Sequence, residues 1–419
     1  MNVLVVGSGA REHALCWKLR QSPLLDALYA APGNAGTAEI AENLPLRDSE
    51  IDALVAAALA HRIDLVVVGP EAPLAAGLAD ALRAAGIAVY GPSRAAAEIE
   101  ASKVWAKELM ARYGIPTARA AAFDDPVSAR RYAAGLPTPP VVKADGLAAG
   151  KGVVVAETLQ EALEAIDAAM VKRAFGEAGR RIVLEERLVG RELSAHAFCD
   201  GTRAVPMEAA CDYKRVFDGD RGPNTGGMGA YSPPAFMTPQ LADEIQQRIV
   251  APTIAALAAE GRPFRGTLFS GLMLTDAGPK VVEFNCRFGD PETEVILPRL
   301  KGDLLPILHA AATSSLEGIE IVWDPRPCVA VVLASGGYPG PYRTGLPIHG
   351  LSDLPPDVIV FHAGTRLEGG QVVTAGGRVL TVVALGETIA AARARAYEGV
   401  RCLAFDEAQY RTDIALLAP

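Results

Sequence analysis

Short apolar segments that end at glycine, each followed by a helical pattern, recur through the first hundred residues. The segments predict strands at 2–6, 27–30, 64–68 and 87–90. The residues between and after them predict helices at 11–20, 49–61 and 73–85. Strands that alternate with helices pair in parallel through right-handed crossovers, and helices then cover both faces of the sheet. These residues therefore predict a parallel, doubly wound α/β sheet.

Ligands of such sheets bind at the carboxyl ends of the strands, where this sequence has GSGAREH (7–13), APGNAGT (31–37) and VGPEAPL (68–74). GSGAREH is only part of a dinucleotide fingerprint, because Glu12 replaces the third glycine and no acid ends the second strand. Its spacing fits a tight turn without a ligand as well as a helix N-terminus that binds a small anion such as phosphate. The rest of the sequence favours the anion site. The alternative is a nucleotide-binding or redox module, which a NAD(P)H titration would reveal.

A lysine on a strand precedes a glycine-rich loop in the middle of the chain. After a helix that begins at Ser102-Lys103, the sequence predicts a strand at 140–143, a loop at 145–152 and a returning strand at 153–156. The loop differs from a Walker A motif because it joins two strands and has Gly152 in place of the hydroxyl residue. A flexible glycine loop can close over phosphates. Lys143 would be costly on such a strand without an anion, although a solvent loop with a snorkelling lysine is the alternative.

An acid and an amide lie two residues apart in VVEFNCRFGDPE (281–292). On a strand, Glu283 and Asn285 point to the same face. Their oxygens suit Mg²⁺, which prefers hard oxygen ligands and phosphate. Cys286 would point to the opposite face, so it is interpreted as a buried structural cysteine.

Two further segments carry candidate binding residues. Glu185 and Glu192 flank a turn at Gly190, where a carboxylate can bind ribose hydroxyls; an ordinary charged linker is the alternative. Residues 217–234 are so rich in glycine and proline that they predict an irregular substrate-binding loop next to Asp212 and Lys214. From about residue 326 the chain is predicted to be β-rich, with strands at 329–334, 358–363, 371–374 and 378–385 and a helix at 388–402.

Composition excludes several classes of function. A net charge of −9 argues against a nucleic-acid or anionic-membrane partner, since both need a basic surface. No apolar run approaches the roughly 18 residues of a membrane-spanning helix. Six cysteines without a C-x-x-C pair exclude a zinc ribbon and favour a reduced, cytoplasmic protein.

Several long motifs together carry a family resemblance that covers essentially the whole chain. They are GxGxREHAL, APGNAGT, VGPEAPL, VVKADGLAAGKGV, DYKR, GPNTGGMGAYSP, EFNxRFGDPET, GGYPGxYRTG and VFHAGT. The chain resembles the glycinamide ribonucleotide synthetase (phosphoribosylamine–glycine ligase) family of the ATP-grasp superfamily. Another ATP-grasp carboxylate–amine ligase is the main alternative, and the residues around Asp212 and Arg287 decide between them.

The resemblance implies three domains: an N-terminal α/β substrate-binding domain at 1–101, an ATP-grasp domain at 102–325 with a lid at about 118–193, and a β-rich C-terminal domain at 326–419. It also implies the reaction ATP + glycine + 5-phosphoribosylamine → ADP + phosphate + glycinamide ribonucleotide, through glycyl phosphate, in purine biosynthesis. The expected partners are these small molecules and Mg²⁺ or Mn²⁺, and the expected assembly is a monomer.

The resemblance also implies site residues. Lys143 and Arg287 would be catalytic, and Glu283 and Asn285 would bind the metal. The implied ATP-binding residues are Lys103, Lys143, Gly146, Gly150, Lys151, Gly152, Glu185, Glu186, Leu188 and Glu192. The implied substrate-binding residues are Gly9, Arg11, Glu12, Asp212, Lys214, Asn224, Gly229, Arg287 and Asp290, with Arg287 and Asp290 holding the carboxylate and the amine.

Overall fold

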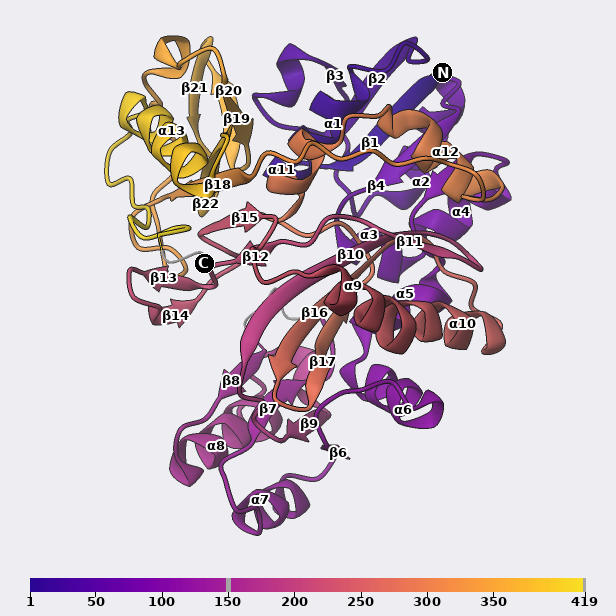
Figure 1. Ribbon diagram of the computed structural model, residues 1–419, viewed down its shortest axis with the longest axis vertical. Coiled ribbons are helices and arrows are strands. Elements are labelled where there is room, and N and C mark those ends of the chain that lie inside the picture. Colours follow the sequence, from indigo (N-terminus) through magenta and orange to yellow (C-terminus); the bar gives the residue numbers. More distant parts are fainter. Residues whose placement is uncertain (148–151, 417–419) are drawn as a thin grey trace.

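A computed structural model describes residues 1–147 and 152–416 of the chain. Its N-terminal part is a sheet of parallel strands in the order β3-β2-β1-β4-β5, which confirms the predicted parallel sheet (Figure 1). The strands are β1 (Asn2–Gly7), β2 (Ala27–Pro32), β3 (Glu42–Asn43), β4 (Leu65–Val68) and β5 (Ala88–Tyr90). The helices are α1 (Ala10–Leu19), α2 (Ile51–Ala60), α3 (Glu71–Ala76), α4 (Leu78–Ala84) and α5 (Arg94–Ala101).

The prediction of a single helix at 73–85 is wrong. Gly77 adopts a φ of +98°, a left-handed conformation that glycine reaches without steric cost, and it divides the segment into α3 and α4. This correction matters for the site, because α3 begins with Glu71 at the carboxyl end of β4.

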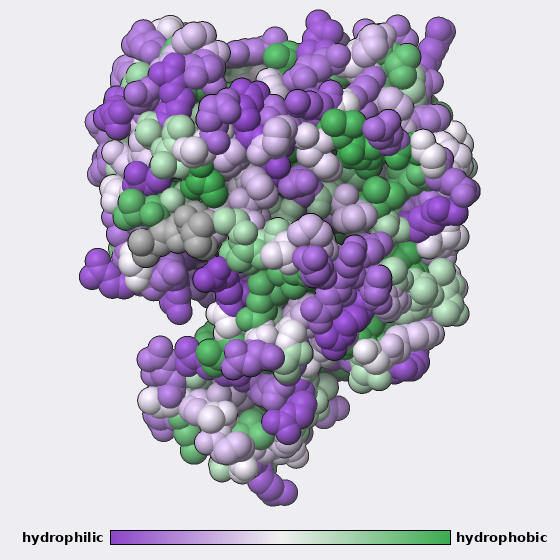
Figure 2. Space-filling model, in the orientation of Figure 1, coloured by the Kyte–Doolittle hydropathy of each residue, from purple (hydrophilic) through white to green (hydrophobic). Residues whose placement is uncertain are grey.

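The segment predicted as a lid forms a separate lobe, at the bottom of Figure 1, with a small core of its own. Its antiparallel sheet has the order β6-β9-β7-β8. The strands are β6 (Ala120–Phe123), β7 (Val141–Ala144), β8 (Val153–Val155) and β9 (Ile182–Glu185), and helices α7 (Pro126–Ala134) and α8 (Leu159–Ile166) pack on them. The predicted pairing of the lysine strand with a returning strand is therefore confirmed. In Figure 2 the lid is set off from the rest of the molecule by a notch.

A second antiparallel sheet, the central sheet, has the order β11-β10-β16-β17 and lies above the lid in Figure 1. Its strands are β10 (Arg191–Asp200), β11 (Ala204–Pro206), β16 (Arg265–Thr275) and β17 (Gly278–Asn285). Helices α6 (Lys103–Tyr113), α9 (Pro239–Ile245) and α10 (Ala251–Ala259) share its hydrophobic core. As predicted, α6 begins at Ser102-Lys103, where Ser102 accepts a hydrogen bond from the Trp105 amide (3.1 Å). The helix ends at Gly114, which has a φ of +68°.

The C-terminal sheet combines strands from two distant parts of the chain in the order β12-β15-β18-β22-β19. These are β12 (Cys211–Asp212), β15 (Gly229–Ser232), β18 (Cys328–Ala334), β22 (Arg378–Leu385) and β19 (Val358–His362). Helix α13 (Ile389–Cys402) packs against β18 and β22. Two hairpins flank the sheet, one made of β13 (Arg215–Phe217) and β14 (Arg221–Asn224), the other of β20 (Thr365–Glu368) and β21 (Gln371–Thr374).

The prediction of an irregular loop at 217–234 is therefore wrong. That segment contains β14 and β15, and β15 pairs along its length with β18. Its glycine and proline content reflects tight turns and close packing, and the segment ties the central part of the chain to the C-terminal sheet.

The N-terminal and C-terminal parts meet through buried hydrogen bonds. The His362 amide donates to Nδ1 of His13 (2.9 Å), and Nδ2 of Asn34 donates to the His362 carbonyl oxygen (2.7 Å). Burial and the neighbouring His362 lower the pKa of His13 to about 3, so this ring is a neutral acceptor. The short helix α11 (Thr293–Ile296) lies between these parts, whereas α12 (Leu304–Thr313) packs against β5, β10 and β16. In the described part of the chain, every helix is too short or too polar to cross a bilayer.

Candidate active site

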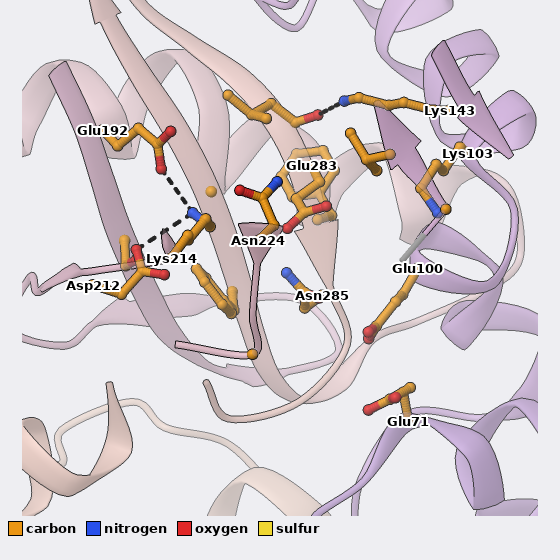
Figure 3. Close-up of a pocket in the computed structure, with 18 of the residues that line it drawn as sticks. Glu71, Glu100, Lys103, Lys143, Glu192, Asp212, Lys214, Asn224, Glu283 and Asn285 are labelled. Carbon is orange, nitrogen blue, oxygen red and sulfur yellow. Dashed lines mark hydrogen bonds and ion pairs between the residues drawn. The ribbon is translucent and has the colours of Figure 1, made fainter. Parts of the chain in front are cut away.

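A cavity of about 520 Å³ opens where the lid, the central sheet, α6 and the C-terminal sheet meet. It brings together most of the residues that the sequence predicts for the site (Figure 3). The predicted residues that line it are Arg11, Lys103, Lys143, Gly146, Gly152, Glu185, Glu192, Asp212, Lys214, Asn224, Glu283, Asn285, Arg287 and Asp290.

The proposed metal ligands share one face of β17, as alternation along a strand requires. The register of β17 against β16 shifts between Gly271 and Leu272, which marks a β-bulge at Val282. Gly271 lies opposite Glu283, and a Cβ added to it would lie 3.3 Å from Cγ of Glu283. The small residue and the bulge therefore leave room for the Glu283 side chain at the floor of the cavity.

The charges around Glu283 keep it ionised. Burial alone would raise the pKa of this carboxyl, but Lys143, Lys214, Lys103 and Arg287 hold it below its ordinary value. Oδ1 of Asn285 lies beside it and accepts a hydrogen bond from Nη2 of Arg287 (3.2 Å).

The pair Glu283–Asn285 fits a hard divalent cation because both donors are oxygens on one face of a strand. Within residues 1–147 and 152–416, no group of three or more His, Cys, Asp or Glu side chains is arranged to hold a metal. A cation at this pair would take its remaining ligands from phosphate oxygens and water, as Mg²⁺ commonly does.

One lysine from the lid and one from α6 line the cavity on the side away from Lys214 (Figure 3). Nζ of Lys143 donates to the carbonyl oxygen of Val282 (2.8 Å) and lies 3.0 Å from Oε2 of Glu185. Nζ of Lys103 donates to the Gly146 carbonyl oxygen (3.2 Å), and burial lowers the pKa of Lys103.

Lys107 belongs to the same cluster, although the sequence analysis missed it. Its Nζ lies 3.2 Å from the Glu185 Oε2 that also binds Lys143, and burial lowers its pKa to about 8. Lys107 follows Lys103 by one turn of α6, so the i, i+4 spacing was a signal in the sequence. Glu185 therefore holds two lysines together through its Oε2, while its buried Oε1 has no hydrogen-bond partner among the described residues.

On the other side of the cavity, Lys214 lies between two acids (Figure 3). Its Nζ is 2.8 Å from Oε2 of Glu192 and 3.3 Å from Oδ1 of Asp212. Burial alone would lower the pKa of Lys214, but the two acids raise it well above its ordinary value. The prediction grouped Asp212 with Lys214, and the structure adds Glu192 to them.

Arg287 is saturated by protein groups that the sequence analysis did not assign. Its Nε lies 3.2 Å from Oε2 of Glu71, and its Nη2 lies 3.5 Å from Oε1 of Glu100. Burial raises the pKa of Glu100, whereas Arg287 and Arg11 bring that of Glu71 below its ordinary value despite burial.

Asp290 is likewise paired within the protein. Its Oδ1 lies 2.9 Å from Nη1 of Arg378, a residue of β22 that also donates to the Asp290 carbonyl oxygen (3.0 Å). The sequence analysis missed Arg378, as well as Glu292, which also lines the cavity. Nothing in the local sequence around either residue signalled these contacts, because their partners lie far away in the chain.

The remaining predicted residues lie outside the cavity lining. Oε2 of Glu12 accepts a hydrogen bond from the Gly9 amide (2.6 Å), so a protein carboxylate occupies the turn in which an anion was expected. Glu186 binds Nε of Arg119 (2.9 Å), Leu188 is half-buried, and a Cβ on Gly229 would lie 2.6 Å from the Ala330 carbonyl oxygen. The predictions for Gly150 and Lys151 fall outside the described residues.

Solved structures place this architecture among known proteins. The chain aligns with a phosphoribosylamine–glycine ligase from Thermotoga maritima with a TM-score of 0.88 and 35% identity, over 99% of this chain and 100% of the other. It also aligns with the biotin carboxylase domain of a Hydrogenobacter thermophilus 2-oxoglutarate carboxylase, solved with MgADP and bicarbonate, with a TM-score of 0.73 over 98% of this chain and 91% of the other. That second pair is 16% identical, so it supports the fold alone.

Sequence comparisons cover nearly the full length. The chain is 51% identical to a phosphoribosylamine–glycine ligase of Rhizobium meliloti, over 99% of this chain and 98% of the relative. It is 48% identical to that of Vibrio vulnificus, over 100% of this chain and 98% of the relative. The phosphoribosylglycinamide synthetase models match as an N domain at 1–100, an ATP-grasp (A) domain at 101–293 and a C domain at 328–417. The family predicted from the motifs is thereby confirmed, and the chain belongs to the phosphoribosylglycinamide synthetase family of ATP-grasp enzymes.

Proposed function

We propose that the chain ligates glycine to 5-phospho-D-ribosylamine with ATP, giving glycinamide ribonucleotide, ADP and phosphate in purine biosynthesis. The observation that carries the proposal is one cavity, in a chain of this family, where Lys103 and Lys143 face the oxygen pair of Glu283 and Asn285. Full-length relatives named for this reaction support the choice of substrates over those of other ATP-grasp ligases.

The first step would activate the carboxylate of glycine, which is a poor electrophile. A carboxylate oxygen attacks the γ-phosphorus of ATP, the bond to the β-phosphate oxygen breaks, and ADP leaves behind glycyl phosphate. Phosphoryl transfer needs positioning and charge neutralisation more than covalent help. Lys143 and Lys103 supply positive charge at the transferring group, and Arg287, which donates to Oδ1 of Asn285, adds positive charge next to the metal pair.

The cofactor proposed for Glu283 and Asn285 is Mg²⁺ or Mn²⁺. When bound, the cation neutralises phosphate charge and orients the phosphates. Glu283 is suited to this role because the surrounding lysines keep it ionised without a close ion pair in the described part of the chain.

In the second step the amine of phosphoribosylamine attacks the acyl carbon. The bond between the acyl carbon and the bridging oxygen of the phosphate breaks, phosphate leaves with that oxygen, and the amine loses a proton. We place ATP between the lid and the central sheet, with Glu192 near the ribose and the segment from Glu185 to Leu188 near the adenine. We place the amine substrate on the side of Arg11, Asn224 and the end of α3. Closure of the lid would keep water from the acyl phosphate.

An isotope experiment tests this reaction. Glycine labelled with ¹⁸O at both carboxylate oxygens should transfer one ¹⁸O to each phosphate released and retain the other in the glycinamide ribonucleotide. Unlabelled phosphate would contradict the acyl phosphate route, and a product without glycine would contradict the proposed substrates. The same assay with other amino acids distinguishes this enzyme from another carboxylate–amine ligase.

A further inference from the structure

Most acidic side chains of the cavity are already paired with a cation of the protein. The paired carboxylates, each within 4.0 Å of a lysine or arginine nitrogen, are Glu71, Glu100, Glu185, Glu192, Asp212 and Asp290. Among the residues that the structure describes, the lining carboxylates without such a partner are Glu283 and Glu292. Glu283 is accounted for by the proposed metal, and Glu292 is not.

Glu292 is almost completely buried, with 2% of its surface exposed, yet it lines the cavity. Its Oε1 accepts a hydrogen bond from the Ser194 hydroxyl (2.9 Å), and its Oε2 accepts none from the described residues. Burying a carboxylate without a cation is costly, so such a group either holds a proton or binds a cation from a ligand.

The nearby histidine does not supply that cation. A Cβ added to Gly289 would lie 2.5 Å from Oε2 of Glu292 and 2.8 Å from Nε2 of His196, so this glycine leaves space between them. His196 is buried against the Phe269 ring, and burial lowers its pKa to about 3. The ring is therefore neutral, and it gives Glu292 no counter-charge.

Two acids near Glu292 share one lysine. Glu192 and Asp212 share the single cation of Lys214, and the charge of Asp212 also acts on Glu292. Glu283 and Glu292 both line the cavity, and the charge of Lys214 acts on both carboxylates. A small molecule between them would meet a metal-binding carboxylate at one end and an unpaired carboxylate at the other.

Of the proposed substrates, ATP and phosphoribosylamine bring phosphate anions, whereas glycine carries no phosphate and brings an amino group that is protonated at neutral pH. We propose that Glu292, held by Ser194 and supported by the negative charge of Asp212, binds the ammonium group of the amino-acid substrate. This inference rests on the proposed function and locates its amino-acid site. It also replaces Asp290 in that role, because Arg378 already neutralises Asp290.

The test removes the charge of Glu292 and keeps the shape of its side chain. Glu292→Gln should raise the KM for glycine by about 30-fold or more, since loss of one partner of a buried charge pair costs on the order of 2–5 kcal/mol. The KM for ATP should stay within about threefold, because glycine binding alone loses a partner. Glycolate, which has a hydroxyl in place of the ammonium, should inhibit wild type and Glu292→Gln with similar inhibition constants.

Three controls separate this role from a structural one. Glu294→Gln changes a buried carboxyl two residues away that does not line the cavity and has no hydrogen-bond partner among the described residues; it should leave the KM for glycine unchanged. Glu292→Asp should restore part of the glycine affinity. Thermal unfolding should show that each variant is folded.

The outcomes are distinguishable. A glycine KM in Glu292→Gln within about threefold of wild type, or equal weakening of glycine and glycolate, overturns the ammonium site and leaves the proposed function standing. If wild type fails to ligate glycine, the proposed function is overturned first and the inference falls with it. Should Glu292→Gln not fold, the glycine-to-glycolate ratio of Glu292→Asp decides, and an unchanged ratio contradicts the proposal.

Discussion

The side-chain amine of Lys143 donates a hydrogen bond to the main-chain carbonyl of Val282 over 2.8 Å. Val282 is the bulged residue next to Glu283, so a lid strand touches the strand of the proposed metal site. Replacing Lys143 with Met should lower kcat/KM on the order of 100-fold, as expected when one electrostatic donor of about 3 kcal/mol is lost at the transition state. Steady-state kinetics with all substrates measures this effect.

Lys172→Met is the matched control for that variant, because Lys172 is an exposed lysine of the same lid. It should have wild-type kinetics. A wild-type kcat/KM in Lys143→Met would reject a role for this lysine in phosphoryl transfer.

Glu283→Gln should abolish ligation through loss of the metal. The substitution removes the charged oxygen donor and leaves four cationic neighbours, Lys143, Lys214, Lys103 and Arg287, without their shared counter-ion. Binding of Mn²⁺ in the presence of ATP, followed by electron paramagnetic resonance, should weaken in parallel with turnover. Glu244→Gln, at an exposed ion pair with Arg248, should change neither quantity. Near-normal turnover of Glu283→Gln at ordinary magnesium would overturn the metal assignment.

The buried Lys107 predicts a pH dependence of stability. Burial lowers its pKa from 10.5 to about 8, so between these values the unfolded chain binds a proton that the folded chain lacks. The free energy of unfolding contributed by this group should therefore rise as pH increases from about 8 towards 10.5. The difference in Tm between wild type and Lys107→Met should shift in favour of wild type over this window. A difference independent of pH would show that Lys107 keeps its proton in the folded protein.

Glycine binding should depend on the ionisation of Glu292. Burial, and then the charge of Asp212, raises the pKa of Glu292 to about 7. The other charged or titratable groups around it are Lys214, Arg287, Arg378 and the neutral His196. Because only the carboxylate pairs with an ammonium group, kcat/KM for glycine should increase from pH 6 to pH 8 in wild type. This step should be absent in Glu292→Gln, and an identical profile in both proteins would contradict the assignment.

The elements with strong local signals were predictable from the sequence. Apolar runs that end at glycine gave the parallel N-terminal strands, and the spacing of Glu283 and Asn285 placed both on one face of β17. The segment at 217–234 was not predictable, because β15 is stabilised by pairing with β18, far along the chain. Local glycine and proline content carries no information about such a partner.

The ion-pair partners of the site residues could not be predicted from the sequence, for the same reason. Arg287 lies next to the metal pair in sequence, which suggested that it binds substrate, but its partners Glu71 and Glu100 come from α3 and α5. Asp290 is neutralised by Arg378 from β22. Only the folded arrangement shows which carboxylates are already paired, and this is why Glu292 emerged from the structure and not from its motif.

The most direct test of the proposed reaction is ADP release by the purified chain with Mg-ATP, glycine and freshly prepared phosphoribosylamine, each omitted in turn. We expect sustained release only when all three are present, with one glycinamide ribonucleotide formed for each ADP. Release that does not need glycine or phosphoribosylamine, or release only with a different acid and amine, would contradict the proposed reaction.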